Sequence, residues 1–418
     1  MQVIKFGGGI LRDPSGVKGI TNILTPFDKN IVVVISAFGK MTNALEMLAE
    51  RYFHRSPAVM EKLDEIRVFH GEMVSGLFPV PGLAVHHKVE ELFGQILKYI
   101  GTRPEGSFDQ IYDHLVSYGE LLSSVIVSEY LTTQCIPNEW VDIRSCLKTD
   151  DYYREARVNY TASEKPVRAA FSPGKTKVFV TQGYIGSTAD GHTTTLGREG
   201  SDYTAAILAN LLDADKAVVY KDVPGILNAD PRWMPDAKKL DEISYQEAIE
   251  LSYFGAQVIH PKTIKPVQNK GIPLYVKDFY HPEEPGTIIR QVDERIDLLP
   301  VIVRKEKQVL ISIWPKDFSF FVDESLDRII SFFINHKIRI NLIQNSAISI
   351  TLCADYRETR FSDLLNDLKK DYSYRYNENL TLYTIRHYDD EAIEKVMNSK
   401  EVLIEQRTRN TVHFLVRE

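Results

Sequence analysis

A turn near the middle of the chain carries the side chains best suited to bind an anion. Residues 197–202 read GREGSD, and a helix-like apolar pattern begins directly after them. A loop that ends at a helix N-terminus offers free backbone N–H groups and a positive dipole end, and Arg198 adds a planar cation that grips carboxylates. The turn therefore predicts a site for a carboxylate or a phosphate, although a plain helix cap made by Ser201 or Asp202 would give the same pattern.

The first residues of the chain offer groups for the same kind of ligand. A strand-like run carries Lys5 near its end and is followed by Gly7, Gly8 and Gly9. Glycines after a strand let the backbone approach a ligand closely and expose successive N–H groups. The pattern is not the nucleotide P-loop, because the only Gly-Lys-Thr in the chain lacks a glycine five residues earlier. A tight turn without a ligand is the plain alternative.

A third stretch, residues 218–232, joins a β-branched run to a Pro-Gly turn. Its cations could bind the phosphates of a nucleotide, and its carboxylates could bind the ribose or the base. The plain alternative is a charged surface loop. The charged side chains concerned are Lys221, Asp222, Asp230 and Arg232.

A mostly parallel sheet must position these loops. Residues 1–295 alternate apolar strand-like runs with helical patterns, which predicts an α/β domain with helices on both faces of the sheet. A loop of small residues, 36–42, follows the second strand, and ligands gather at such ends in open α/β sheets. The predicted strands are residues 2–6, 31–36, 177–181, 217–221 and 273–277.

The chain changes character after an exit strand and linker at residues 286–300. Residues 301–418 read as two β-α-β-β passes, which predicts a second, α+β domain over residues 296–418.

Composition excludes several classes of function. The 418 residues carry a net charge of −7 without a basic stripe, so nucleic acid is not expected as a partner and the cations for an anionic ligand must be local. Three scattered cysteines (Cys135, Cys146 and Cys353) favour neither a disulfide framework nor a zinc site. There is no leader and no apolar run of about 18 residues, so we expect a cytoplasmic protein without a membrane partner.

The order and spacing of the motifs resemble those of the aspartate kinases of the amino-acid kinase family over nearly the whole chain. This resemblance implies the family's mostly parallel sheet sandwiched by helices, followed by tandem ACT-like modules that bind an amino acid and help to form a homodimer. A structural β-α dimerisation domain without an effector is the alternative for the tail. The motifs are KFGGG (5–9), VVVISAFGKMTNAL (32–45), YGELLSS (118–124), VTQGYIGSTADGHTTTLGREGSDYTAA (180–206), KDVPGILNADPR (221–232) and SYFGAQVIHPKTIKPV (252–267).

The reaction implied by the resemblance transfers the γ-phosphoryl group of ATP to the side-chain carboxylate of L-aspartate, and it opens lysine, threonine and methionine biosynthesis. A carboxylate with a pKa near 4 is already ionised at pH 7, so the nucleophile needs no general base. The enzyme must instead hold two anions in line and spread the developing charge, which explains cations and backbone donors without a Ser-His-Asp set.

The resemblance also implies roles for individual residues. Arg198 would bind the α-carboxylate of aspartate and Glu120 its α-ammonium, while Mg²⁺ would be held mainly by ATP oxygens without a dedicated protein site. The catalytic residues would be Lys5 and Asp202. The amino-acid pocket would be completed by Ser36, Thr42, Tyr184, Thr195 and Ser201. The nucleotide would be bound by Lys5, Gly7, Gly8, Gly9, Lys221, Asp222, Asp230, Arg232 and Gln257.

The chain departs from the family pattern at several positions. Gly9-Ile10-Leu11 replaces a Thr-Ser-Val that supplies a hydroxyl, and Tyr184 replaces a Phe. Lys221 stands where many relatives have Thr, and Gln257 where they have Lys. We hypothesise that Lys221, or alternatively Lys262, takes over the lost charge.

Two departures concern the tail. Asn341 replaces an Asp that could pair with an incoming ammonium group, so weak or absent inhibition by lysine is predicted. The sequence stops after TVHFLVRE, where relatives usually continue with a helix, so the second module is expected to be shortened and no homoserine dehydrogenase to follow.

Two competing functions stay open. One is a kinase for another small carboxylate, such as glutamate or acetylglutamate, which the pairing of Arg198 with Glu120 disfavours for the acetylated substrate. The other is a catalytically inactive amino-acid sensor that retains ACT modules. The presence of Lys5, Arg198 and Asp202 argues against the sensor.

Overall fold

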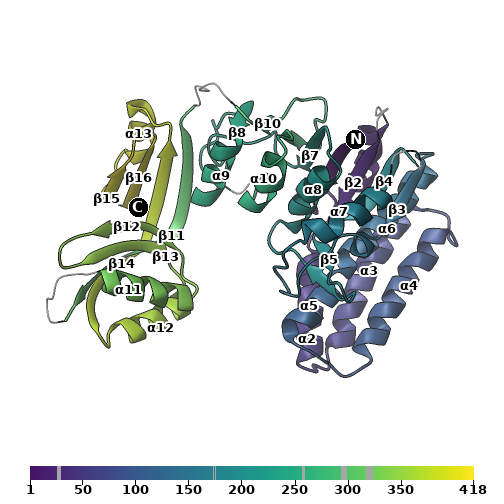
Figure 1. Cartoon of the computed structure of the whole chain (residues 1–418), viewed down its shortest axis with the longest axis horizontal. Coiled ribbons are helices and arrows are strands. Elements are labelled where there is room, and N and C mark those ends of the chain that lie inside the picture. Colours follow the sequence, from purple (N-terminus) through teal and green to yellow (C-terminus); the bar gives the residue numbers. More distant parts are fainter. Residues whose placement is uncertain (26–29, 173, 175, 257–258, 293–298, 317–322) are drawn as a thin grey trace. The chain divides into compact units, whose positions relative to one another are not determined.

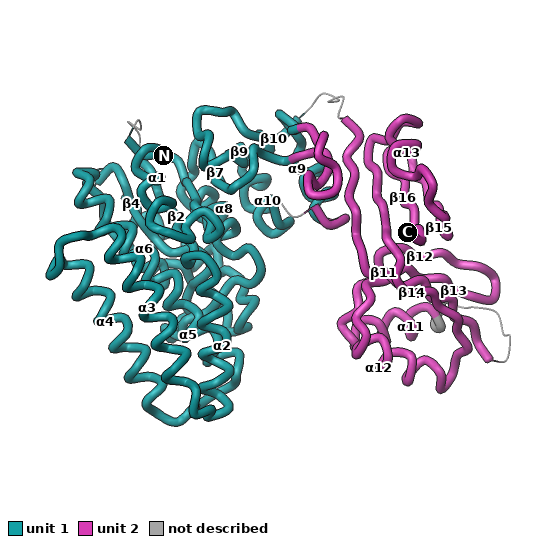
Figure 2. The backbone as a smooth tube through the Cα atoms, turned by 180° about the vertical axis from the view of Figure 1, so that it is seen from behind, with its two compact units in different colours: residues 1–226, 239–252, 257–296 teal, residues 227–238, 253–256, 297–418 magenta. Residues whose placement is uncertain are grey.

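The computed structural model describes residues 1–25, 30–172, 174, 176–256, 259–292, 299–316 and 323–418, so Gln257 lies outside the described residues. The chain divides into two compact units (Figure 2). The first unit contains residues 1–226, 239–252 and 257–296, and the second contains residues 227–238, 253–256 and 297–418.

An eight-stranded, mostly parallel sheet forms the centre of the first unit (Figure 1). Its strands are β1 (Gln2–Phe6), β2 (Ile31–Ile35), β3 (Asn138–Val141), β4 (Val178–Gln182), β7 (Lys216–Lys221), β8 (Glu242–Ser244), β9 (Leu274–Asp278) and β10 (Thr287–Arg290). They lie in the order β3-β4-β2-β1-β7-β9-β10-β8, and among these strands β9 and β10 pair antiparallel. The predicted α/β class is confirmed, and β1, β2, β4, β7 and β9 match the predicted runs to within a residue.

Helices flank this sheet, and a short hairpin stands apart from it. The helical elements are α1 (Pro14–Leu24), α2 (Met41–Phe53), α3 (Val59–Leu77), α4 (Ala84–Ile100), α5 (Phe108–Val116), α6 (Tyr118–Thr133), η1 (Ile143–Ser145), α7 (Tyr160–Ala170), α8 (Gly200–Leu211), α9 (Tyr245–Phe254) and α10 (Pro261–Gln268). The hairpin consists of β5 (Ile185–Ser187) and β6 (Thr193–Thr195). None of the described helices combines the length and the apolar run that a membrane span requires.

The central strands explain why the loops meet. Every residue of β1 and β2 is buried, as expected for parallel strands that are covered on both faces by helices. Lys5 pairs in register with Val34 of β2 and Val219 of β7, while α8 packs directly against β1. The glycine loop after β1, the end of β7 and the start of α8 therefore come together at one edge of the sheet.

A six-stranded antiparallel sheet forms the second unit, in the order β12-β13-β11-β14-β16-β15. Its strands are β11 (Val301–Pro315), β12 (Ile340–Asn345), β13 (Ile350–Asp355), β14 (Tyr372–Arg386), β15 (Glu401–Arg407) and β16 (Thr411–Arg417), and its helices are α11 (Asp323–Asn335), α12 (Glu358–Leu368) and α13 (Asp390–Met397). Apolar side chains of α11 and α12 pack on β11 and β13, while those of α13 pack on β14 and β16.

The two β-α-β-β passes follow one another as predicted, but the two halves of the sheet are not built from consecutive segments, because β11 and β14 each run through both halves. The first half of β11 pairs with the last half of β14, and the second half of β11 pairs with the first half of β14, with register shifts between residues 305 and 310. The segment that forms the first half of the sheet is thus inserted between two segments that form the second half. Helix α12 was not predicted, although its apolar side chains follow a helical spacing.

Candidate active site

The predicted catalytic pair is in contact. Lys5 projects from β1, and its Nζ lies 2.5 Å from Oδ1 of Asp202, which stands in the first turn of α8. Asp202 is only 2% exposed and Lys5 only 7%. A buried carboxylate needs such a partner, since an unpaired charge is costly to remove from water.

Lys221 at the end of β7 binds the other oxygen of the same carboxylate. Its Nζ lies 3.0 Å from Oδ2 of Asp202, and its side chain is 18% exposed. Burial opposes ionisation of Asp202, but the two ammonium groups outweigh it and hold the pKa of this carboxyl below its ordinary value. Burial likewise opposes the charge of Lys221, yet Asp202 and Glu199 raise the pKa of its amine.

The glycine loop after β1 requires its small residues. A Cβ on Gly8 would lie 2.6 Å from the carbonyl oxygen of Ala37, and a Cβ on Gly7 would lie 3.2 Å from Nζ of Lys5. Gly39 donates its N–H to the carbonyl of Gly8 at 3.1 Å, so this loop and the 36–42 loop approach each other closely. A side chain at Gly8 would therefore clash with backbone, whereas one at Gly7 would press on the ammonium group of Lys5.

The turn that precedes α8 is not an ordinary helix cap. Ser201 and Asp202 lie inside the first turn of the helix, and the N-cap residue, Glu199, makes no capping hydrogen bond with its side chain. Glu199 adopts a left-handed backbone, with φ of 54°. Because Asp202 binds two lysines instead of capping the helix, the plain alternative for this motif is wrong.

Glu120 of α6 lies beside the 36–42 loop. One of its oxygens accepts the N–H of Ala37 at 3.3 Å, while Oε2 is buried without a hydrogen-bond partner. Burial raises the pKa of this carboxyl to about 8. An incoming ammonium group would supply the missing partner and favour the ionised form.

The predicted pocket residues Thr195 and Tyr184 have partners of their own. Thr195 donates its hydroxyl to Asp113 at 2.6 Å and its N–H at 2.8 Å. The hydroxyl of Tyr184 lies 3.3 Å from that of Tyr112. Asp113 is fully buried, and burial raises its pKa to about 6. These contacts make Thr195 part of a fixed wall whose hydroxyl still has acceptor capacity.

The remaining predicted residues are placed less uniformly. Ser36 follows β2 and Thr42 lies in the first turn of α2, and both are half-buried. Arg198 is exposed on the turn before α8. Oδ2 of Asp222 lies 3.9 Å from the position that a Cβ on Gly9 would take, so Asp222 adjoins the glycine loop.

Two predicted nucleotide contacts fall in the second unit instead. Arg232 binds Asp230 there, with Nη2 2.5 Å from Oδ2, and Arg232 is 78% exposed. Asp230 and Arg232 thus belong to the compact unit that does not contain Lys5.

Sequence reasoning missed Glu199 and Asp113. A glutamate between two glycines looks like a solvated loop residue, and an aspartate in the amphipathic α5 looks the same whether it faces water or protein. The left-handed backbone of Glu199 and the burial of Asp113 become visible only in the fold.

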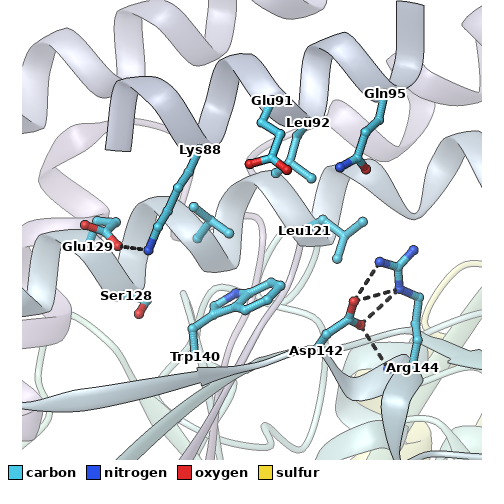
Figure 3. Close-up of a pocket in the computed structure, with 11 residues that line it drawn as sticks. Lys88, Glu91, Leu92, Gln95, Leu121, Ser128, Glu129, Trp140, Asp142 and Arg144 are labelled. Carbon is cyan, nitrogen blue, oxygen red and sulfur yellow. Dashed lines mark hydrogen bonds and ion pairs between the residues drawn. The ribbon is translucent and has the colours of Figure 1, made fainter. Parts of the chain in front are cut away.

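A separate pocket of about 310 Å³ opens between α4, α6 and β3 (Figure 3), and it contains none of the predicted residues. Trp140 forms part of its apolar wall and donates its indole N–H to Ser124 at 2.9 Å. Four of its charged side chains pair internally, Lys88 with Glu129 and Arg144 with Asp142, and Glu91 also lines it.

Residues 1–278 match the model of the amino acid kinase family. Among curated proteins, the lysine-sensitive aspartokinase 3 of Escherichia coli (strain K12) is 32% identical over 355 residues, which cover 84% of this chain and 78% of the relative. The chain belongs to the aspartokinase family. It is therefore a kinase of the phosphotransferase class, and the predicted family is confirmed.

Solved structures agree with this assignment. E. coli aspartokinase III in complex with aspartate and ADP (R-state) superposes with a TM-score of 0.82, at 29% identity over 100% of this chain and 96% of that chain. The same enzyme in complex with lysine and aspartate (T-state) gives a TM-score of 0.84 at the same identity and coverage. This aspartokinase thus has a fold similar to that of E. coli aspartokinase III in its R-state and in its T-state.

Proposed function

We propose that this aspartokinase phosphorylates the side-chain carboxylate of L-aspartate with ATP, giving ADP and 4-phospho-L-aspartate. The observation that carries the proposal is the buried Asp202, held between Lys5 and Lys221 at the edge of the sheet where the glycine loop begins. Cations and backbone donors at one place suit the transfer of a phosphoryl group between two anions.

In this proposal Lys5 contacts the transferring phosphoryl group, and Asp202 orients Lys5. Gly7, Gly8 and Gly9 supply backbone room and donors for the phosphates. Because the aspartate side chain is already ionised at neutral pH, no residue has to remove a proton from it. Asp202 serves as a fixed counter-charge rather than as a base.

The enzyme recognises the α-ammonium and the α-carboxylate groups of its amino-acid substrate. The unpartnered Oε2 of Glu120 takes the α-ammonium group, and the exposed Arg198 takes the α-carboxylate as the turn before α8 closes on it. Ser36, Thr42, Tyr184, Thr195 and Ser201 complete the pocket. This arrangement favours a free α-amino acid over an acetylated one.

The nucleotide enters with Mg²⁺. This ion keeps several waters and binds through substrate phosphates and few carboxylates, so ATP oxygens hold most of it. Asp222 lies beside the glycine loop and is a candidate for one of these carboxylates. Asp230 and Arg232 remain candidates for the base and ribose, and Gln257 for the phosphates.

The second unit is proposed as a tandem ACT-like regulatory domain that supports a homodimer, with the kinase domain ending near residue 295. Asn341 donates to Gln308 at 2.6 Å and to Asp355 at 2.8 Å, and it accepts from Lys305 at 2.9 Å. Because the amide is engaged by the protein itself, we expect lysine to inhibit weakly.

A hydroxamate assay with ATP and Mg²⁺ tests the proposed reaction. Aspartate should give acyl phosphate, whereas glutamate and acetylglutamate should give less than about a tenth of that rate at equal concentration. If glutamate or acetylglutamate reacts faster than aspartate, that compound is the substrate instead. If none of the three carboxylates gives a product, the inactive amino-acid sensor is the better hypothesis.

A further inference from the structure

Four charged side chains meet beside the proposed phosphoryl position. Lys5 and Lys221 bind the two oxygens of Asp202, and the carboxylate of Glu199 lies near enough for both lysines to favour its charged form. Glu199 comes from the turn before α8, and Lys221 comes from the end of β7. Three separate segments therefore build one compact group of charges.

The balance of this group depends on Lys221. Two ammonium groups face the carboxylates of Asp202 and Glu199, so these four charges sum to zero, and Asp222 adds a further negative charge that acts on Lys221. Without Lys221 the group would hold one ammonium and two carboxylates, and this excess negative charge would face the phosphates of ATP. Like charges repel strongly at short range in a partly buried site, where water screens them poorly.

Both the backbone conformation and the buried carboxylate of Glu199 are energetically unfavourable. Its φ of 54° lies in the left-handed region that non-glycine residues seldom adopt, and its neighbour Gly197 has φ of 79°. Oε2 of Glu199 is buried without a hydrogen-bond partner. Burial raises the pKa of this carboxyl, and the charge of Lys221 is the strongest effect in the opposite direction. The charged form of Glu199 is thus favoured mainly by Lys221.

We propose that Lys221 neutralises Glu199 and Asp202 together, so that the charge of Lys5 stays available to the transferring phosphoryl group, and that Glu199 and Lys221 act as a coupled pair. The inference rests on the proposed phosphoryl transfer and assigns Lys221 a positioning role within it. Lys221 acts through the charges around Lys5, whether or not it also touches a phosphate.

The first experiment replaces Lys221 with Met and measures kcat and the KM for ATP in the full-length enzyme. We expect kcat/KM for ATP to fall at least tenfold, while Lys221→Arg, which keeps the charge, stays within about threefold of the wild type. The matched control is Lys216→Met, which removes a lysine from the other end of β7. A change of less than twofold in both kinetic constants of Lys221→Met overturns the proposal.

The second experiment tests the coupling with a double-mutant cycle. Glu199→Gln combined with Lys221→Met removes one negative and one positive charge and so keeps the net charge of the wild type, and the double variant should recover most of the kcat/KM that Lys221→Met loses. A double variant as impaired as Lys221→Met, or worse, overturns the coupling. ADP binding by calorimetry gives the same cycle without turnover and applies even where kcat is too low to measure.

These outcomes separate the inference from the proposed reaction. A wild type without activity on aspartate contradicts the reaction itself. An active wild type whose Lys221→Met variant binds ADP and turns over normally contradicts the inference alone. Thermal unfolding of each variant, compared with Lys216→Met, identifies any loss that comes from misfolding.

Discussion

Each unit of this aspartokinase holds a carboxylate against lysine, but in different surroundings. In the first unit, Asp202 is 2% exposed and is bound by two lysines. In the second unit, Asp355 lies 2.6 Å from Lys305 with side-chain exposures of 31% and 24%, and amide groups complete its contacts. Water screens the second cluster and little reaches the first.

The difference indicates what each cluster is for. Burying three charges stabilises a protein poorly, because the loss of hydration offsets most of the attraction between them. Such a group persists where its electrostatic field does work on a ligand. The amide-rich cluster around Asp355 satisfies its own hydrogen bonds and needs no ligand to complete it.

The largest effect should come from removing the cation at the centre of the first cluster. Lys5→Met takes away a preorganised charge at the proposed phosphoryl position, so we expect kcat to fall by about 10²–10³-fold. A coupled ADP-release assay measures it, with Lys18→Met, an exposed lysine of α1, as the control. Activity within threefold of the wild type would remove Lys5 from the mechanism.

Stability distinguishes the two carboxylates directly. Asp202→Asn leaves Lys5 and Lys221 buried beside each other without a counter-charge, and we expect a loss of about 3–5 kcal/mol. Asp355→Asn breaks a partly screened pair and should cost less than about 1 kcal/mol. Guanidinium unfolding, followed separately by probes in each unit, compares them. Equal losses would mean that burial does not separate the clusters.

The pH dependence of substrate binding probes Glu120, which lies in the first unit beside the 36–42 loop. Its pKa of about 8 keeps it largely protonated below that pH, whereas binding an ammonium group needs the ionised form. The KM for aspartate should therefore fall about tenfold from pH 6 to pH 7 and level off above pH 8. Glu120→Gln should remove this dependence, and Glu129→Gln on the same helix should keep it.

The smallest effect is expected in the second unit. Lysine should inhibit the wild type only at millimolar concentrations, because Asn341 offers no charge to an ammonium group and already binds Lys305, Gln308 and Asp355. Initial rates at increasing lysine concentration test this, with leucine as the control. Half-inhibition at micromolar lysine would contradict the comparison between the two clusters.

The sequence predicted most of the first unit because its strands are apolar runs that are buried on both faces, as β1 and β2 show. The resemblance to the aspartate kinases also implied that Lys5 and Asp202 act together, and the two side chains are in contact. The sequence did not predict that Asp113 accepts a hydrogen bond from the hydroxyl of Thr195, because burial of a helical carboxylate depends on neighbours distant in the chain.

The second unit was predicted less completely for a related reason. Local patterns reveal strands and helices but not which strands pair over long separations, and β11 joins β14 across the intervening residues 316–371. The assignment of Arg232 to this unit was not predicted for a similar reason. Its loop follows β7 directly in the sequence, yet it belongs to the second unit.

The two strands shared by both repeats have a mechanical consequence. Each is 15 residues long, or about 50 Å when extended. A twist imposed at one end of β11 must travel along the same hydrogen-bonded ladder to the other end, and the irregular stretch between residues 305 and 310 is the natural place for it to be absorbed. The two halves of the sheet are therefore mechanically coupled through β11 and β14, and they bend relative to each other at the irregular stretch.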